Sequence, residues 1–210
     1  MVTGEVIFCP YYSDLAELCG HGDQRGLPVS FPLKVLKTIQ AIGVLLRADG
    51  VKRMNYMRLL KLLYMADRES LRETGRPITG GPVTAMERGP VLEEVYDLIR
   101  GQHREMPLWD TFFRKERYDL IELCEPDVGK LSKYEISKLQ EIAKEHEDKD
   151  EWALVQYTHD LPEWKQNDPG TSSKPISLAN ILEAVGRSAD VEEISKEAQS
   201  LAIFERILGK

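Results

Sequence analysis

Hydrophobic residues return every three or four positions in two successive segments of the chain, which is the spacing of an amphipathic helix. The first segment, residues 33–50, ends at Gly50, a residue type that favours the left-handed conformation at helix ends. The second begins after Asn55, a favoured N-cap residue, and ends at Gly75. Because residues 56–66 are apolar on nearly every side, the pattern predicts that this second helix is buried at the centre of the fold.

The remaining pattern predicts a short strand and several further helices. Alternating apolar residues at 118–124 are typical of a strand. Ser132 and Glu135 form a capping box, which opens a helix that extends to about Glu147. Other helices are expected at 151–160, 177–186 and 190–208, and residues 101–117 are expected to be irregular. The prediction is a mainly α (α+β) fold, a compact helical domain around a central buried helix with a small β-hairpin or short sheet.

The stretch "RPITGGPVTAMERGPVLEEVYDLI", residues 76–99, raises the question of a phosphate-binding loop. Pro82 and Pro90 each follow a glycine and remove a backbone amide that such a loop needs, and no lysine followed by serine or threonine comes after them. The stretch predicts instead a hairpin with residues 77–79 and 83–86 as its strands. Gly89 then allows a sharp turn, and Pro90 is expected at the first position of a helix.

Composition and charge narrow the classes of partner. The formal net charge is −7 and the pI is near 5.3, so the chain as a whole repels phosphate backbones and DNA binding is not expected. No apolar run approaches the roughly 20 residues that cross a bilayer, so no membrane contact is expected. Cys9, Cys19 and Cys124 do not form a disulfide framework. These features favour a cytoplasmic protein whose acidity suits a basic partner.

Candidate chemistry is sparse. His159 and Asp160 are adjacent on a predicted helix and therefore point to different sides, which disfavours an acid–base couple between them. A small hydrolase centred on His159, with Asp160 or Cys124, remains an alternative. Cys9, Cys19 and His21 could supply three zinc ligands, but the close pairs typical of zinc sites are missing. No catalytic constellation stands out.

The central helix also carries a basic stripe. Arg58, Lys61, Arg68 and Arg72 recur at steps that bring them onto one face, with Glu69 and Glu73 beside them. Two interpretations are open. The stripe either forms ion pairs within the fold, or it offers a surface to an acidic or phosphate-bearing partner. The second interpretation includes a DNA-binding regulator.

The last predicted helix has an apolar stripe of its own. Such a stripe either caps the core or docks into the groove of a partner or of a second copy. Its members are Val191, Ile194, Ala198, Leu201 and Leu208, and Ile203, Phe204 and Ile207 widen it in the last turns.

Four segments in this order carry a family resemblance: "KLLYMADRESLRETGRPITGGPVTAMERGPVLEEVYDLI" (61–99), "YDLIELC" (118–124), "YTHDLPEWKQ" (157–166) and "PISLANILEAVG" (175–186). Together they resemble the Panacea domain family, the SocA-like antitoxins and phage-associated GepA-like proteins of bacteria and their phages. The resemblance covers about residues 33–186. It implies a helical domain without enzymatic activity or cofactor, an antitoxin of a type II system that neutralises a cognate protein toxin by binding it.

The family leaves one alternative open, because one branch acts as an adaptor that delivers its toxin to a Clp protease. With the resemblance, the chain divides into an N-terminal arm at 1–32, a Panacea-like domain at 33–187 and a C-terminal helix at 188–210. We expect the arm, the helix or both to confer specificity for one toxin, and self-association is a further alternative.

Individual motif positions are carried over as residues that fasten the fold or bind the partner. We expect Asp67 and Arg76 to form an ion pair at the junction of helix and hairpin, and Trp164 to anchor its loop in the core. The full set of motif positions is Lys61, Tyr64, Asp67, Arg68, Arg76, Gly80, Gly89, Pro90, His159, Leu161, Pro162 and Trp164.

Overall fold

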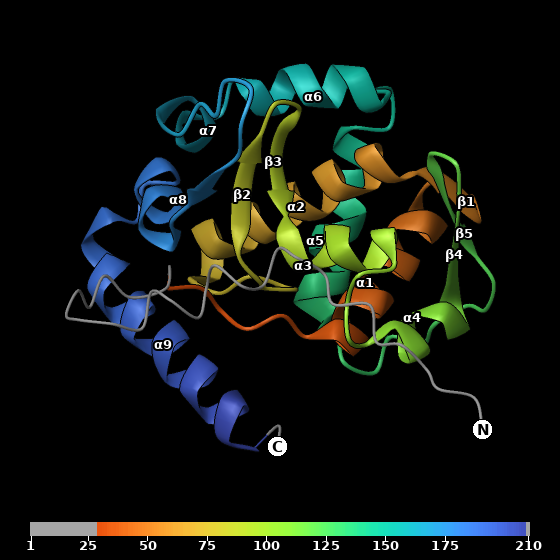
Figure 1. Cartoon of the computed structure of the whole chain (residues 1–210), viewed down its shortest axis with the longest axis horizontal. Helices are drawn as coiled ribbons and strands as arrows, with labels where there is room; N and C mark the ends of the chain where they lie inside the picture. Colours follow the sequence, from red (N-terminus) through yellow and green to blue (C-terminus); the bar gives the residue numbers. More distant parts are fainter. Residues whose placement is uncertain (1–28, 209–210) are drawn as a thin grey trace, which may run out of the picture.

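The computed structural model describes residues 29–208, and helices surround two small three-stranded antiparallel sheets in this part of the chain (Figure 1). This is the mainly α fold with some β structure that the sequence pattern predicts. The helices are α1 (Val35–Ala48), α2 (Tyr56–Thr74), α3 (Glu93–Arg100), α4 (Met106–Phe112), α5 (Lys133–Glu145), α6 (Glu151–His159), α7 (Pro162–Gln166), α8 (Leu178–Ala184), the short 3₁₀ turn η3 (Ser188–Asp190) and α9 (Val191–Leu208). The strands are β1 (Arg53–Asn55), β2 (Val83–Met86), β3 (Gly89–Leu92), β4 (Phe113–Glu116), β5 (Asp119–Glu122) and β6 (Lys174–Ile176).

The helix α2 is the centre of the fold, as its pattern predicts. It packs against α1, α3, α5, α6 and α8 and against strands of both sheets. The Asn55 side chain caps its first turn by accepting a hydrogen bond from the Met57 amide (2.9 Å). Gly75 ends it in the left-handed conformation, with φ of 77°, and donates to the Leu71 carbonyl. Its apolar side chains are therefore buried on several sides at once.

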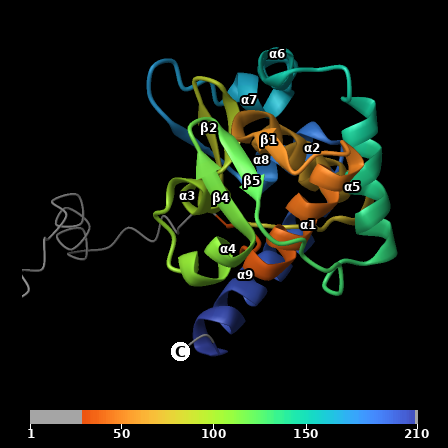
Figure 2. The same ribbon diagram turned by 90° about the vertical axis from the view of Figure 1, so that its right-hand side faces the viewer.

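The two sheets lie on different sides of α2. One has the order β1–β5–β4, and Met54 of β1 pairs with Leu120 of β5. Figure 2, seen from the side of this sheet, shows α4 next to β4. The other has the order β3–β2–β6, and Val83 of the middle strand pairs with both Leu92 and Ile176. The strand β6, which the pattern of the sequence did not predict, thus joins the hairpin from a distant segment.

The hairpin lies at different residues from those expected. The strands β2 and β3 form it, and residues 77–79 form a loop instead of its first strand. The reason is a contact from α2, described below, that holds the amides of this loop. Pro90 lies in β3 and not at the start of a helix, because α3 begins only at Glu93. As β3 is an edge strand, the missing amide of Pro90 costs it no ladder hydrogen bond.

The passage 101–117, expected to be irregular, contains regular structure. It holds α4, with Pro107 in its first turn, and the strand β4. Trp109 and Phe113 from this passage are almost fully buried, and their ring centroids are 4.9 Å apart. Their burial against the core stabilises a helix too short to show a clear period in the sequence.

Other expectations are confirmed at the level of single caps. Ser132 and Glu135 form both hydrogen bonds of the capping box that opens α5. The helices α6, α8 and α9 lie where the pattern places them. No helix among the described residues is long and apolar enough to cross a membrane. Residues 1–28, which include most of the expected arm and the candidate zinc ligands Cys9, Cys19 and His21, lie outside the described residues.

Candidate functional site

The motif positions carried by α2 lie on its buried side. Lys61, Tyr64 and Asp67 have side chains that are at most 3% exposed, and Arg68 next to them is only partly exposed. The first three lie within two turns and on the same side of the helix. The four side chains bind three separate segments, because Lys61 contacts Pro90, Asp67 contacts the loop 78–80, and Tyr64 and Arg68 share Glu163. This one helix therefore ties together elements that are far apart in the chain.

Asp67 holds the loop that precedes the hairpin. Its carboxylate accepts hydrogen bonds from the amides of Ile78 (3.0 Å), Thr79 (2.9 Å) and Gly80 (3.2 Å) and from the Thr79 hydroxyl (2.6 Å). Burial raises the pKa of Asp67 to about 6, although these four hydrogen bonds favour the charged form. Gly80 has φ of 80°, a conformation that turns its amide toward the carboxylate and that glycine adopts readily.

The expected ion pair between Asp67 and Arg76 is wrong. Arg76 is exposed, and its guanidinium instead contacts Glu197 of α9 at 2.6 Å. The physical reason is that backbone and hydroxyl donors already satisfy the buried carboxylate, whereas a guanidinium would have to be desolvated to reach it. Arg76 therefore links the loop to α9 at the surface, where such a pair contributes little.

Glu163, which the sequence analysis did not single out, is the central partner of α2. Its side chain is fully buried and accepts hydrogen bonds from the Tyr64 hydroxyl (2.8 Å) and from Arg68 Nε (2.7 Å) and Nη2 (3.4 Å). It lies between Pro162 and Trp164, in the first turn of α7. Its place in the middle of the "LPEW" motif was the signal that could have identified it.

Lys61 is a buried lysine with one hydrogen bond. Its Nζ donates to the Pro90 carbonyl at 2.8 Å, and burial lowers its pKa from 10.5 to about 7. Gly89 makes this approach possible, since a Cβ there would lie 2.9 Å from Lys61 Nζ and 2.6 Å from the Thr158 hydroxyl. The glycine and proline of the motif thus let β3 lie directly on the lysine.

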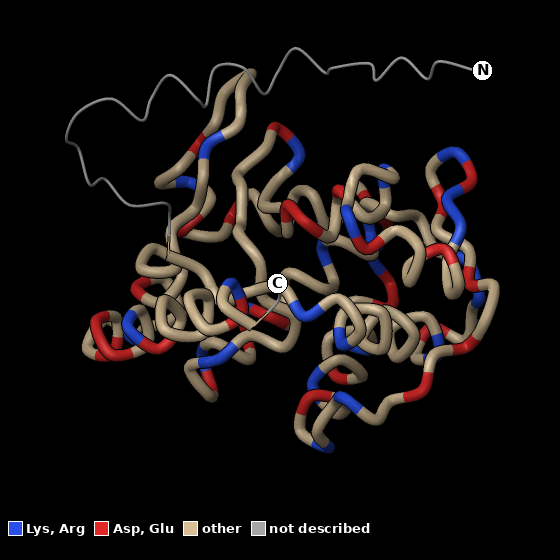
Figure 3. The backbone as a smooth tube through the Cα atoms, turned by 60° about the horizontal axis from the view of Figure 1, so that its bottom comes forward, with Lys and Arg blue, Asp and Glu red and all other residues tan. Residues whose placement is uncertain are grey.

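The basic stripe is used inside the fold. Arg58 donates to the carbonyls of His146 and Lys149 and pairs with Asp49 (2.5 Å). Arg72 pairs with Glu69 and Glu73, and Arg68 with Glu163. Figure 3 shows basic and acidic positions interspersed over the described chain, as these pairs require. Of the two interpretations of the stripe, the structure favours ion pairs within the fold.

His159 packs on Trp164 and does not face Asp160. The two rings stack with centroids 4.0 Å apart and planes 13° apart. Burial and the positive charge of Lys61 lower the pKa of His159. Asp160 is exposed and pairs with Lys165 (2.9 Å), while Cys124 is exposed after β5. In the described residues His159 therefore has neither of the partners that the hydrolase alternative needs.

Trp164 and Leu161 attach this junction to the hairpin side of the fold. Trp164 Nε1 donates to the Met86 carbonyl at 3.2 Å. Leu161 is the N-cap residue of α7, and Pro162 takes the first helical position. The residues from α6 and α7 thereby lie against the hairpin and α2. We refer to Glu163 and the carried-over positions other than Arg76, eleven in all, as the network around α2; most of these residues are buried or half-buried.

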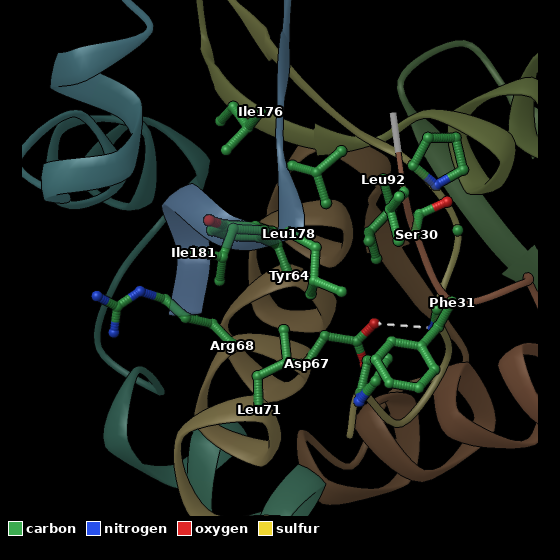
Figure 4. A pocket seen from close by; sticks show the side chains of 16 residues that line it. Ser30, Phe31, Tyr64, Asp67, Arg68, Leu71, Leu92, Ile176, Leu178 and Ile181 are labelled. Atoms are coloured by element: carbon green, nitrogen blue, oxygen red, sulfur yellow. Dashed lines mark hydrogen bonds between the residues drawn. The ribbon is translucent and has the colours of Figure 1, made fainter. Parts of the chain in front are cut away.

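A small pocket of about 40 Å³ lies beside the network. Tyr64 and Asp67 approach it from α2, whereas Leu178 and Ile181 approach it from α8, and the Arg68 guanidinium points away (Figure 4). Its lining is mainly apolar. No group of three metal-ligating side chains occurs in residues 29–208.

Exposed side chains are more suitable for a partner, and α9 concentrates several of them. Ile194 and Ala198 are buried against α8, so the first half of α9 caps the core. The second half runs beyond α8 into solvent (Figure 1). Leu208, expected on the core-facing stripe, is exposed instead. The exposed apolar side chains of this end are Ile203, Phe204, Ile207 and Leu208, which are 45–65% exposed.

Comparison with known proteins identifies a family whose match covers the network. A family model described as "Antitoxin SocA-like, Panacea domain" matches residues 59–165, slightly more than half of the chain. All the carried-over positions fall within this span, and the exposed end of α9 falls outside it. No curated protein and no solved structure matches the chain.

Proposed function

Because the chain belongs to the SocA-like Panacea antitoxin family, we propose that it is the antitoxin of a type II system and neutralises a cognate protein toxin by direct binding. It acts in the cytoplasm and without catalysis. The family match is the observation that carries this proposal, and the buried network supports it indirectly. Side chains that are fastened inside the fold leave partner binding to exposed surfaces.

We assign the toxin contact to the exposed end of α9. Ile203 and Ile207, and likewise Phe204 and Leu208, are four residues apart and form one apolar ridge along the helix. A ridge of this kind fits the groove of a partner protein. Because α9 carries four glutamates against one lysine and one arginine, the groove that fits it has a basic rim.

The charge of the whole chain acts in the same direction. At a net charge of −7 the protein attracts a positively charged toxin at long range and accelerates the encounter. We therefore expect the association rate to fall as salt is raised. If the association rate did not change between low and high salt, electrostatic steering would be refuted. That result would not contradict the proposed apolar contact of α9.

The experiment is co-expression in bacteria with the product of the neighbouring gene, scored by growth and then by co-purification. The wild-type protein should restore growth and form a complex. Phe204→Glu with Ile207→Glu should abolish both, because two carboxylates would be forced into an apolar groove. Leu123→Glu with Val128→Glu is the matched control, since these exposed apolar side chains lie elsewhere on the fold.

The outcomes separate the alternatives. A toxic neighbour that the wild-type protein neither rescues nor binds would refute the antitoxin function. Rescue by the α9 variant at the wild-type level would place the contact elsewhere. Rescue that is lost in a Clp-deficient strain would establish the adaptor mechanism, and a change from dimer to monomer in the α9 variant would assign the ridge to self-association.

A further inference from the structure

A second exposed surface joins aromatic rings with cations and does not belong to the network or to α9. It is formed by Tyr56, Tyr96, Tyr118, Arg88, Arg100 and Lys115, and we refer to it as the tyrosine–cation face. Its residues come from the first turn of α2, from α3, from the β2–β3 turn and from the β4–β5 hairpin. These elements converge on one side of the fold (Figure 1).

The rings at the centre of this face are held in place. The Tyr56 ring lies 6.3 Å from the Tyr96 ring and 6.5 Å from the Tyr118 ring, measured between centroids. The Tyr56 amide also donates to the Tyr118 carbonyl at 2.9 Å. Tyr118 is nevertheless 69% exposed. A large side chain that is both exposed and fixed loses little entropy on binding.

Cations cover the faces of these rings. Lys115 Nζ lies 5.1 Å from the Tyr56 centroid, and Arg100 Cζ lies 5.0 Å from the Tyr96 centroid. Arg88 stacks on the exposed Trp152 at 5.2 Å and is close enough to Tyr56 for its charge to affect that hydroxyl. Each cation is thereby positioned. Arg100 also donates from Nη2 to the Gln102 side chain, and its other polar hydrogens have no side-chain acceptor among the described residues.

These cations differ from most others in the described chain, because they lack carboxylate partners there. The nearby carboxylates of Glu116 and Asp119 are already paired with Arg114 and Arg53. Arg88, Arg100 and Lys115 form no ion pair within residues 29–208. Arg88, Arg100 and Lys115 are therefore cations of this face that can pair with the carboxylates of a partner.

The backbone of the β4–β5 turn is a second, independent observation about this face. Arg117 at its tip has φ of 55°, and in the described residues it is the non-glycine residue with positive φ. A side chain in that conformation costs about 1–2 kcal/mol relative to glycine. The turn thus keeps an arginine next to Tyr118 at a position where glycine would be less strained.

We propose that the tyrosine–cation face binds an acidic segment of a partner protein. Tyrosine, tryptophan and arginine are the residues that dominate protein interfaces, and pre-positioned cations suit carboxylates. A single-stranded nucleic acid fits less well, because its bases stack on free aromatic faces, and cations already lie over the rings of Tyr56, Tyr96 and Trp152. Of the rings in this face, Tyr118 is the one without a cation over it within residues 29–208. The proposal concerns a different surface from α9 and does not require the partner to be a toxin.

The test uses the full chain and fluorescence anisotropy with three labelled probes: a peptide of alternating glutamate and alanine, one of alternating lysine and alanine, and an oligothymidylate. The glutamate peptide should bind most tightly. Replacing Arg88, Arg100 and Lys115 together by glutamine should weaken it at least about tenfold. Tyr118→Ser, which leaves the charge unchanged, should weaken it several-fold.

A control with the same loss of charge separates this face from the general electrostatics. Lys130, Lys133 and Lys144 are exposed on and before α5, and replacing all three by glutamine should leave the affinity nearly unchanged. If the two triple variants lost affinity for the glutamate peptide to the same extent, the proposal would be overturned. Absence of binding to the glutamate peptide, or tighter binding of oligothymidylate, would overturn it as well. None of these outcomes depends on toxin neutralisation.

Discussion

Replacing Lys61 by methionine removes one positive charge from the centre of the fold and keeps an unbranched side chain of similar length. The lysine is 1% exposed, and its ammonium has a single hydrogen bond, to the Pro90 carbonyl. Burial lowers its pKa from 10.5 to about 7. The buried lysine therefore lowers the free energy of unfolding, by an amount that depends on pH.

The sign follows from proton binding in the two states. Above pH 10.5 the lysine is neutral in both the folded and the unfolded chain. Between pH 10.5 and about 7 the unfolded chain binds a proton that the folded chain does not, so stability falls as pH falls. Each pH unit in this window lowers the free energy of unfolding by up to about 1.4 kcal/mol. Below about pH 7 both states are protonated and the contribution stays constant.

The assay is urea unfolding of the wild type and of Lys61→Met at several pH values from 7 to 10. Trp109, which is almost fully buried, reports unfolding by its fluorescence. The stability of the variant relative to the wild type should increase by roughly 3–4 kcal/mol from pH 10 to pH 7. The lost hydrogen bond to Pro90 does not change over this range and cancels in the comparison.

Lys138 supplies the control. It is also buried, and burial lowers its pKa, but hydrogen bonds to Glu141 and Glu73 more than compensate, so its pKa is raised. Lys138→Met should therefore show no comparable pH dependence between pH 7 and 10. A constant difference between Lys61→Met and the wild type over this range would mean that Lys61 keeps an ordinary pKa, and the reasoning from burial would be refuted.

Three further predictions address other parts of the fold. Glu163→Gln should lower the free energy of unfolding by about 1–3 kcal/mol in urea, because it removes the buried carboxylate that accepts from the Tyr64 hydroxyl and the half-buried Arg68 guanidinium. Gly80→Ala should cost well over about 1 kcal/mol, since its Cβ would lie 2.5 Å from the Pro32 carbonyl oxygen, whereas Gly50→Ala, with similar φ and open space, should cost only about 1 kcal/mol. Ser132→Ala should lower the thermal midpoint through a loss of about 1 kcal/mol.

Helix positions could be predicted because their signals are local. The cap at Asn55, the left-handed end at Gly75 and the capping box at Ser132 all act within a few residues. The hairpin could not be placed correctly from the same information. Residues 77–79 are the β-prone run that the pattern selects, whereas residues 89–92 begin with Gly-Pro and resemble a helix start. The pairing with 89–92 depends on Asp67, a side chain from the preceding helix that binds the amides of the loop 78–80.

The site shows the same limit. Lys61, Tyr64 and Arg68 could be identified as a set from the motif, but their partners lie 29 to 99 residues away in the chain. Glu163 is an ordinary first-turn glutamate by local rules, and only the fold brings it to Tyr64. The ion pair of Asp67 with Arg76 was a reasonable inference from sequence distance, and it fails because backbone amides satisfy a buried carboxylate at lower cost.

Buried motif residues also constrain how function can be assigned to this chain. The positions that carry the resemblance lie within residues 59–165, and most of them bind other parts of the same molecule. A substitution at Asp67 would therefore reduce binding to any partner by unfolding the protein, whichever surface contacts that partner. Loss of function identifies a contact surface only for variants such as Phe204→Glu, because the Phe204 side chain is 59% exposed and does not belong to the core. The motif residues therefore identify the fold, and the partner has to be identified through variants of exposed residues.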